Sequence, residues 1–270
     1  MEPRFDYLKT ARGVYEAMLG LEKYLHQSGL EPSLRELVKL RASQLNGCAF
    51  CIDPCPFGAL TLVEYSDNGQ TRHRVQVNES LCKGCGVCMG TCPKGGIYVS
   101  HFRPEELSAE VHAALADARS GAPDGGEFEP VILALCCYWC SYTGADLAGT
   151  SRIQYPSNVR IVRVQCTGMI NLGLVVDAFL GGADGVMVCG CHPGDCHYVS
   201  GNERAKSRAE AIDLMLHDFG LEPQRFRLRW VSASEGGRFA QLVKEMVDEV
   251  KAIGPSRYHP SMQREMDIGV

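Results

Sequence analysis

The chain has 270 residues, of which 45% are apolar and 22% charged, with a net charge of −5 at pH 7. This composition is typical of a soluble globular protein of about two domains and excludes a disordered chain. The weak negative charge gives no reason to expect nucleic acid or an anionic membrane as a partner. The longest strongly apolar stretch, residues 131–140, is too short to span a bilayer, and the N-terminus lacks a signal-peptide core. We therefore expect a cytoplasmic protein.

The first half of the chain predicts two kinds of structure. Apolar residues recur at helical spacing over residues 1–47, so we expect a helical segment there. Short strands are predicted at 60–65 and 73–77, joined by a hairpin turn at Asp67-Asn68-Gly69. A helix then begins at Pro104, where proline and two glutamates form a favourable first turn.

The second half alternates strands with helices. The run of glycine, serine and proline at 120–126 predicts a linker. Strands are expected at 131–135, 159–164, 185–188 and 226–231, and later helices end at Gly220 and Gly254. Such alternation predicts a parallel sheet covered by helices, and hence an α/β fold class. The predicted divisions are a helical segment (1–53), a small ferredoxin-like α+β cluster domain (54–119), a linker (120–130), a parallel-sheet domain (131–255) and a tail (256–270).

Fourteen cysteines are the outstanding feature of the composition. They fall in two bands, residues 48–92 and 136–196, and the last 74 residues contain none. In a reducing cytosol, clustered thiols bind metals or carry out redox chemistry more often than they form disulfides.

The sharpest motif is Cys82-x2-Cys85-x2-Cys88-x3-Cys92-Pro93. In ferredoxins such a run binds three irons of a 4Fe–4S cluster with its first three thiolates, and its fourth cysteine serves a neighbouring cluster. A zinc knuckle is the alternative, but zinc sites use two separated pairs rather than four cysteines in eleven residues. The segment around Cys55-Pro56 echoes that around Cys92-Pro93, so we expect Cys55 to be the fourth ligand of this cluster.

A second cluster is incomplete in the sequence. Cys48, Cys51 and Cys55 match the last three positions of the same run, so Cys48 and Cys51 would join Cys92. The remaining ligand is expected at position 45, where the chain has Leu45. A three-iron cluster, a labile four-iron cluster and no cluster at all remain open.

The second cysteine band follows the ends of three predicted strands. Because the carboxyl ends of parallel strands share one sheet edge, these thiols should converge and bind a soft metal or an iron–sulfur centre. We expect Cys136 and Cys189, flanked by apolar strand residues, to be core. The expected ligands are Cys137, Cys140, Cys166, Cys191 and Cys196.

Two resemblances bear on these bands. Residues 131–255, with CCYWCSYTGADLAG and GADGVMVCGCHPGDCHY, resemble the delta subunit of methyl-viologen-reducing (F420-non-reducing) hydrogenase. This resemblance implies a 2Fe–2S cluster held by four of the five cysteines. Residues 55–117, with VNESLCKGCGVCMGTCPKGGI, resemble the C-terminal ferredoxin region of the A subunit of heterodisulfide reductase, without its flavin-binding body, so no flavin is expected on this chain alone.

The beginning of the chain has a third resemblance. The segment ELVKLRASQLNGCAFCID, residues 36–53, is similar to the carboxymuconolactone decarboxylase/alkylhydroperoxidase D family. In that family Glu36, Cys48 and Cys51 would match a proton-relay carboxylate and a redox thiol pair. The family has a histidine four residues after the second cysteine, and here that position is Cys55.

Two functions are therefore expected in order of preference. The first is a non-catalytic iron–sulfur subunit that relays electrons between a hydrogenase (or formate dehydrogenase) and a heterodisulfide reductase-type flavoprotein. The alternative is a thiol redox enzyme that acts through Cys48 and Cys51, with Glu36 assisting proton transfer.

Overall fold

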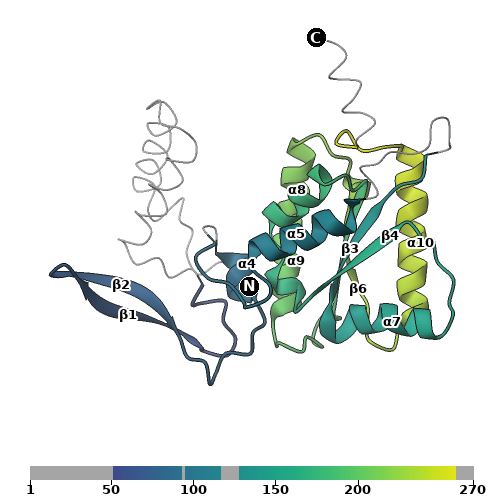
Figure 1. Cartoon of the computed structure of the whole chain (residues 1–270). Helices are drawn as coiled ribbons and strands as arrows, with labels where there is room; N and C mark the ends of the chain where they lie inside the picture. Colours follow the sequence, from purple (N-terminus) through teal and green to yellow (C-terminus); the bar gives the residue numbers. More distant parts are fainter. Residues whose placement is uncertain (1–50, 93–94, 117–127, 260–270) are drawn as a thin grey trace, which may run out of the picture. The chain divides into compact units, whose positions relative to one another are not determined.

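A computed structural model describes residues 51–92, 95–116 and 128–259 (Figure 1). The predicted helical segment at 1–47 and most of the expected linker lie outside these residues. The described residues fall in two compact units: the hairpin tip, Leu62–Val75, belongs to one, and residues 51–61 and 76–259 belong to the other.

The hairpin forms as its turn residues predict. Strands β1 (Leu60–Asp67) and β2 (Gln70–Val77) pair with each other. Asn68 and Gly69 have φ angles of 53° and 78°, as a two-residue turn matched to the strand twist requires. Both strands are longer than expected but include the predicted residues.

The sheet of the larger unit has four parallel strands. They are β3 (Ile132–Cys137), β4 (Val159–Val164), β5 (Gly185–Gly190) and β6 (Phe226–Trp230), in the order β4-β3-β5-β6. Every residue of β3 and β5 is buried, as expected for central strands covered on both faces. The predicted α/β class and all four predicted strands are thus confirmed.

Helices cover both faces of this sheet (Figure 1). On one face lie α5 (Pro104–Ala114), α8 (Leu172–Leu180) and α9 (Gly201–Asp218). On the other face lie α7 (Thr143–Thr150) and α10 (Gly236–Ile253). Among the described helices, none combines the length and the apolar character needed to cross a bilayer.

Helix α5 joins the core of the sheet. The division expected from the sequence places this helix in the ferredoxin-like region, residues 54–119. In the structure its residues Leu107 and Val111, and Leu115 directly after it, are almost fully buried. They pack in the cluster that contains Leu133 and Val162 of the sheet. The ferredoxin-like cysteine run and the sheet are consequently parts of one compact unit.

A buried arginine ties the end of α10 to the sheet. Arg225 is fully buried and donates hydrogen bonds to the carbonyls of Asp184, Gly254 and Pro255, at 3.0, 3.0 and 3.1 Å. Its guanidinium also pairs with Glu222 at 2.5 Å, which lowers the pKa of that carboxyl. Because the guanidinium has no water around it, these partners supply its solvation.

We expect Arg225→Ala to lower the free energy of unfolding by about 3 kcal/mol, because it leaves buried carbonyl groups without donors. Urea unfolding followed by circular dichroism measures this. The control is Arg227→Ala, two residues later on β6, whose partially exposed pair with Glu249 should be worth less than about 1 kcal/mol. Equal losses in the two variants would contradict the role given to Arg225.

Candidate metal centres

Five cysteines gather at the carboxyl edge of the sheet. Cys137 is the last residue of β3, Cys191 directly follows β5, and Cys166 lies two residues beyond β4. Cys140 is carried by η1 (Tyr138–Tyr142), a single π-helical turn after β3, and Cys196 lies in the loop before α9. The predicted convergence at the strand ends is therefore present.

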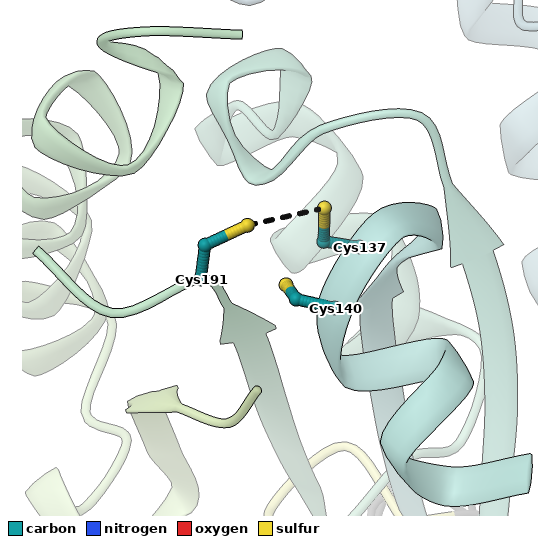
Figure 2. Close-up of side chains that lie close together, drawn as sticks. All are labelled: Cys137, Cys140 and Cys191. Atoms are coloured by element: carbon teal, nitrogen blue, oxygen red, sulfur yellow. Dashed lines mark hydrogen bonds between the residues drawn. The ribbon is translucent and has the colours of Figure 1, made fainter. Parts of the chain in front are cut away.

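Three of these thiols form a tight group. The sulfur atoms of Cys137, Cys140 and Cys191 all lie within 4.8 Å of one another, and the three side chains are buried. Figure 2 shows them pointing towards a common centre, Cys191 from the loop after β5 and the other two from the end of β3 and the turn after it. The Cys137 and Cys191 sulfurs are 4.0 Å apart. Two sulfurs on one tetrahedral metal ion, each bonded at about 2.3 Å, lie about 3.8 Å apart, so this pair suits metal ligation.

The other two thiols complete the network. Cys166 is close to Cys137 and Cys196, and Cys196 is close to Cys191, so these thiols interact. Gly201, the first residue of α9, allows this approach: a Cβ at this position would lie 2.2 Å from the Cys166 sulfur and 3.3 Å from the Cys196 sulfur. Cys166 and Cys196 thus lie beside the group of three, and their role as ligands stays a prediction.

The pKa values of these thiols are shifted in opposite directions. Hydrogen bonds from Cys140, Cys166 and Cys191 lower the pKa of the Cys137 thiol. The same hydrogen bonds, together with burial, raise the pKa values of Cys140 and Cys166. A metal that binds here must displace those protons, and its own positive charge favours their loss.

Polar contacts hold the loops that carry these cysteines. The buried Asn202 side chain donates to the carbonyls of Cys191 and His192, at 3.2 and 2.6 Å. Ser141 donates to the Cys189 carbonyl at 2.6 Å, which fixes the π-helical turn to β5. Such outer contacts orient metal ligands. Sequence reasoning did not single out Asn202, Ser141 or Gly201, and their nearness to a cysteine in the sequence is the one signal they carry.

Cys136 and Cys189 lie on the opposite face of the sheet. They pair in register across β3 and β5, are fully buried and pack in the cluster beneath α10, so their predicted core role is confirmed. A mutual hydrogen bond and burial hold the pKa of Cys136 well above its usual range.

The ferredoxin-like run surrounds a separate cavity of about 330 Å³. Its lining includes the four cysteines predicted for the first cluster: Cys55, Cys82, Cys85 and Cys88. Gly84 and Gly86 have φ angles of 65° and 76°, a backbone form that glycine adopts without strain. Four thiols and a close backbone around one hollow fit a 4Fe–4S cluster.

Burial changes the pKa values of two thiols of this cavity. It raises the pKa of Cys85, and burial together with the neighbouring Cys85 raises the pKa of Cys88 to about 12. Cys82 alone of the four is exposed. Without a bound cation these two thiols stay protonated at neutral pH.

The second, incomplete cluster stays a prediction. Cys51 is buried and Cys92 is partly buried, and neither lines the cavity just described. The Cys92 sulfur accepts a hydrogen bond from the Gly96 amide at 3.3 Å. Cys48, Leu45 and Glu36 lie outside the described residues.

Three family models match different parts of the chain. Residues 132–254 match the methyl-viologen-reducing hydrogenase delta subunit, residues 46–96 a 4Fe–4S dicluster domain, and residues 12–56 the carboxymuconolactone decarboxylase family. The middle region is thus a domain of a kind that binds iron–sulfur clusters.

Relatives of the sheet domain are matched over nearly their whole length. The vhc iron-sulfur D subunit of the F420-non-reducing hydrogenase of Methanococcus voltae is 47% identical over 128 residues, which are 47% of this chain and 89% of the relative. The corresponding D subunit of Archaeoglobus profundus is 44% identical over 132 residues, 49% of this chain and 96% of the relative. The chain belongs to the methyl-viologen-reducing hydrogenase delta subunit family.

Another relative matches a longer stretch of this chain. The A subunit of ferredoxin:CoB-CoM heterodisulfide reductase of Methanosarcina mazei is 44% identical over 209 residues, 77% of this chain. A stretch of that length in a chain of 270 residues must include residues 62–209, and hence both the ferredoxin-like run and the five-cysteine site. The chain spans about a quarter of that relative, 24% of its length.

We expect Gly201→Ala to disturb the five-cysteine site selectively. The new Cβ meets the Cys166 sulfur, costs about 1–3 kcal/mol in crowding and displaces a candidate ligand. Iron analysis and electron paramagnetic resonance (EPR) of anaerobically purified protein should show loss of the signal from a cluster at this site, with the signal from the ferredoxin-like site kept. Gly149→Ala, in open space on α7, is the control and should keep both signals. An unchanged signal from the five-cysteine site in Gly201→Ala would argue against Cys166 as a ligand.

Proposed function

We propose that this chain is an electron-transfer subunit, itself non-catalytic, that relays electrons between a hydrogenase or formate dehydrogenase and a heterodisulfide reductase-type flavoprotein. The observation that carries the proposal is the presence of two groups of cysteines, each gathered around its own site, in one compact unit. The relatives support the two ends of the relay, because one group is named for a hydrogenase and the other for a heterodisulfide reductase.

Each cysteine group receives one cofactor in this proposal. Cys55, Cys82, Cys85 and Cys88 hold a 4Fe–4S cluster. Four of the five thiols Cys137, Cys140, Cys166, Cys191 and Cys196 hold a 2Fe–2S cluster. Bound there, the clusters supply reversible one-electron chemistry. The protein holds the thiolates, excludes water from the buried ones and fixes their loops through Ser141 and Asn202.

The remaining assignments follow from this role. The flavin is assigned to the partner protein and the relay to the cytoplasm. Cys92, Cys48 and Cys51 are kept as ligands of an incomplete second cluster, for which the match to a dicluster domain over residues 46–96 is the support. Neither nucleic acid nor a membrane has a part in the proposal.

The decisive experiment compares two adjacent cysteines of β3. Cys137→Ala should abolish the 2Fe–2S EPR signal and leave the 4Fe–4S signal, because Cys137 faces the other thiols. Cys136→Ala, one residue earlier on the opposite face, should keep both signals and cost stability only, about 1–3 kcal/mol for its lost packing. Iron and sulfide analysis accompanies the spectra. Iron-free wild-type protein after anaerobic reconstitution would end the electron-transfer proposal.

A reciprocal variant tests the other site. Cys85→Ala removes a buried thiol of the ferredoxin-like cavity, so it should abolish the 4Fe–4S signal and leave the 2Fe–2S signal unchanged. Loss of both signals in this variant, with the fold intact by circular dichroism, would mean that the cysteines do not divide into two sites as proposed.

A second candidate function rests on the match of residues 12–56 to the carboxymuconolactone decarboxylase family. In this proposal Cys48 and Cys51 cycle between dithiol and disulfide, and Glu36 assists proton transfer. We expect peroxide-dependent thiol oxidation that is lost in Cys48→Ser while iron content stays unchanged. Thiol titration before and after peroxide measures it, and equal oxidation of the variant would contradict it. The electron-transfer function is preferred, because Cys55 stands where that family has a histidine.

A further inference from the structure

The two cysteine sites meet in a single apolar cluster. Cys85 and Val87 from the ferredoxin-like run pack with Cys166 from the five-cysteine site, and Tyr198 joins them. All four residues are buried, at 8%, 0%, 1% and 6% exposure. Phe57, which lines the ferredoxin-like cavity, packs against the same cluster. A thiol of each proposed iron–sulfur site thus lies in the same apolar contact.

Glycines bring the two backbones into close contact. The ferredoxin-like run enters α4 (Val87–Thr91), which packs on η2 (Thr167–Met169), the short turn after Cys166. A Cβ on Gly168 would lie 2.7 Å from the Val87 side chain, and one on Gly86 would lie 2.8 Å from Met169. Such spacing leaves no room for water between the two segments.

Arg208 fastens the same two segments from α9. Its guanidinium donates to the carbonyls of Gly168 and Ile170, at 2.8 and 2.6 Å, and to the Thr91 hydroxyl at 3.1 Å. Thr91 ends α4, whereas Gly168 and Ile170 follow Cys166. One side chain therefore joins the helix after Cys85 to the loop after Cys166.

Tyr198 contacts aromatic residues that lie near each of the two sites. Its ring meets Phe57 edge to face, with centroids 6.5 Å apart, and its hydroxyl accepts a hydrogen bond from the Trp139 indole at 2.9 Å. Trp139 lies between Cys137 and Cys140 in the sequence and stacks on His197, with centroids 3.7 Å apart. The ring of Tyr198 is thus held between residues of both sites.

We propose that Val87, Tyr198 and Arg208 form a water-free layer between the two cysteine sites. This layer holds the sites close enough for an electron to pass directly from one to the other within one chain. The proposal rests on the proposed electron-transfer function and adds how the two sites communicate. Val87 and Tyr198 fill the space between the sites, and Arg208 is a positioning residue that fixes their separation. One electron crosses at a time: one site is oxidised and the other reduced, without a bond change or a proton transfer. The partner dehydrogenase supplies the electron.

The alternative is that each site serves a different partner and that electrons pass between the sites only through a third protein. The packing argues against it, because residues from both sites are buried against each other rather than exposed. The match to the Methanosarcina mazei relative also spans the regions of both sites in one chain. A direct exchange requires no further protein.

The test measures the magnetic interaction of the two reduced centres in the full-length, anaerobically reconstituted protein. Dithionite reduces both, and power saturation of the 2Fe–2S EPR signal is recorded. We expect faster relaxation of this signal than in Cys85→Ala, which lacks the 4Fe–4S cluster. Identical saturation in the two proteins, with iron content showing both clusters in the wild type, would overturn the proposal and leave the electron-transfer function standing. Absence of iron in the wild type would overturn both.

Variants of Arg208 and Tyr198 test the layer between the two sites. Arg208→Met should loosen the contact and reduce the relaxation enhancement at full iron content, whereas Arg204→Met, exposed one turn earlier on α9, should not. Tyr198→Leu removes the ring and should also reduce the enhancement, and Tyr198→Phe should restore it. Circular dichroism confirms folding of each variant. Unchanged enhancement in both Arg208→Met and Tyr198→Leu would show that these residues do not set the contact.

Discussion

The site depends on the parallel pairing of β3 with both of its neighbours. Cys137 is in register with Val164 of β4, and Cys136 with Cys189 of β5, so the three strands leave the sheet at nearly the same level. Parallel strands deliver the loops that follow them to one edge. Thiols more than fifty residues apart in sequence, such as Cys137 and Cys191, lie 4.0 Å from each other because the sheet itself positions them.

The same pairing separates the grouped thiols from the cysteines of the core. Alternation along β3 directs Cys136 to the face beneath α10 and Cys137 to the side that holds Cys140 and Cys191. At the end of the strand, the π-helical turn then returns Cys140 to the Cys137 side. Adjacent residues of one type thus differ in role because a strand has two faces, and a shift of register by one residue would exchange those roles.

The sequence predicted the strands, the hairpin and the grouping of cysteines, because these depend on local patterns: alternating apolar runs, Asn68-Gly69 and fixed cysteine spacing. It did not predict the packing of α5 on the sheet or the contact of Val87 with Gly168. These depend on which surfaces meet in three dimensions, and an amphipathic helix such as α5 gives no sign of its partner. Arg208 and Asn202 were missed for the same reason, since a single polar residue on a helix is usually exposed to water.

The thiols that line the ferredoxin-like cavity differ in exposure, and this difference determines which of them is oxidised first. Cys82 is exposed, whereas Cys85 is buried and Cys88 partly so. Thiolates become oxidised in order of their exposure and ionisation. Molecular oxygen and peroxide therefore reach the Cys82 thiol first, and in the proposed 4Fe–4S site this thiolate would be the first ligand lost on exposure to air.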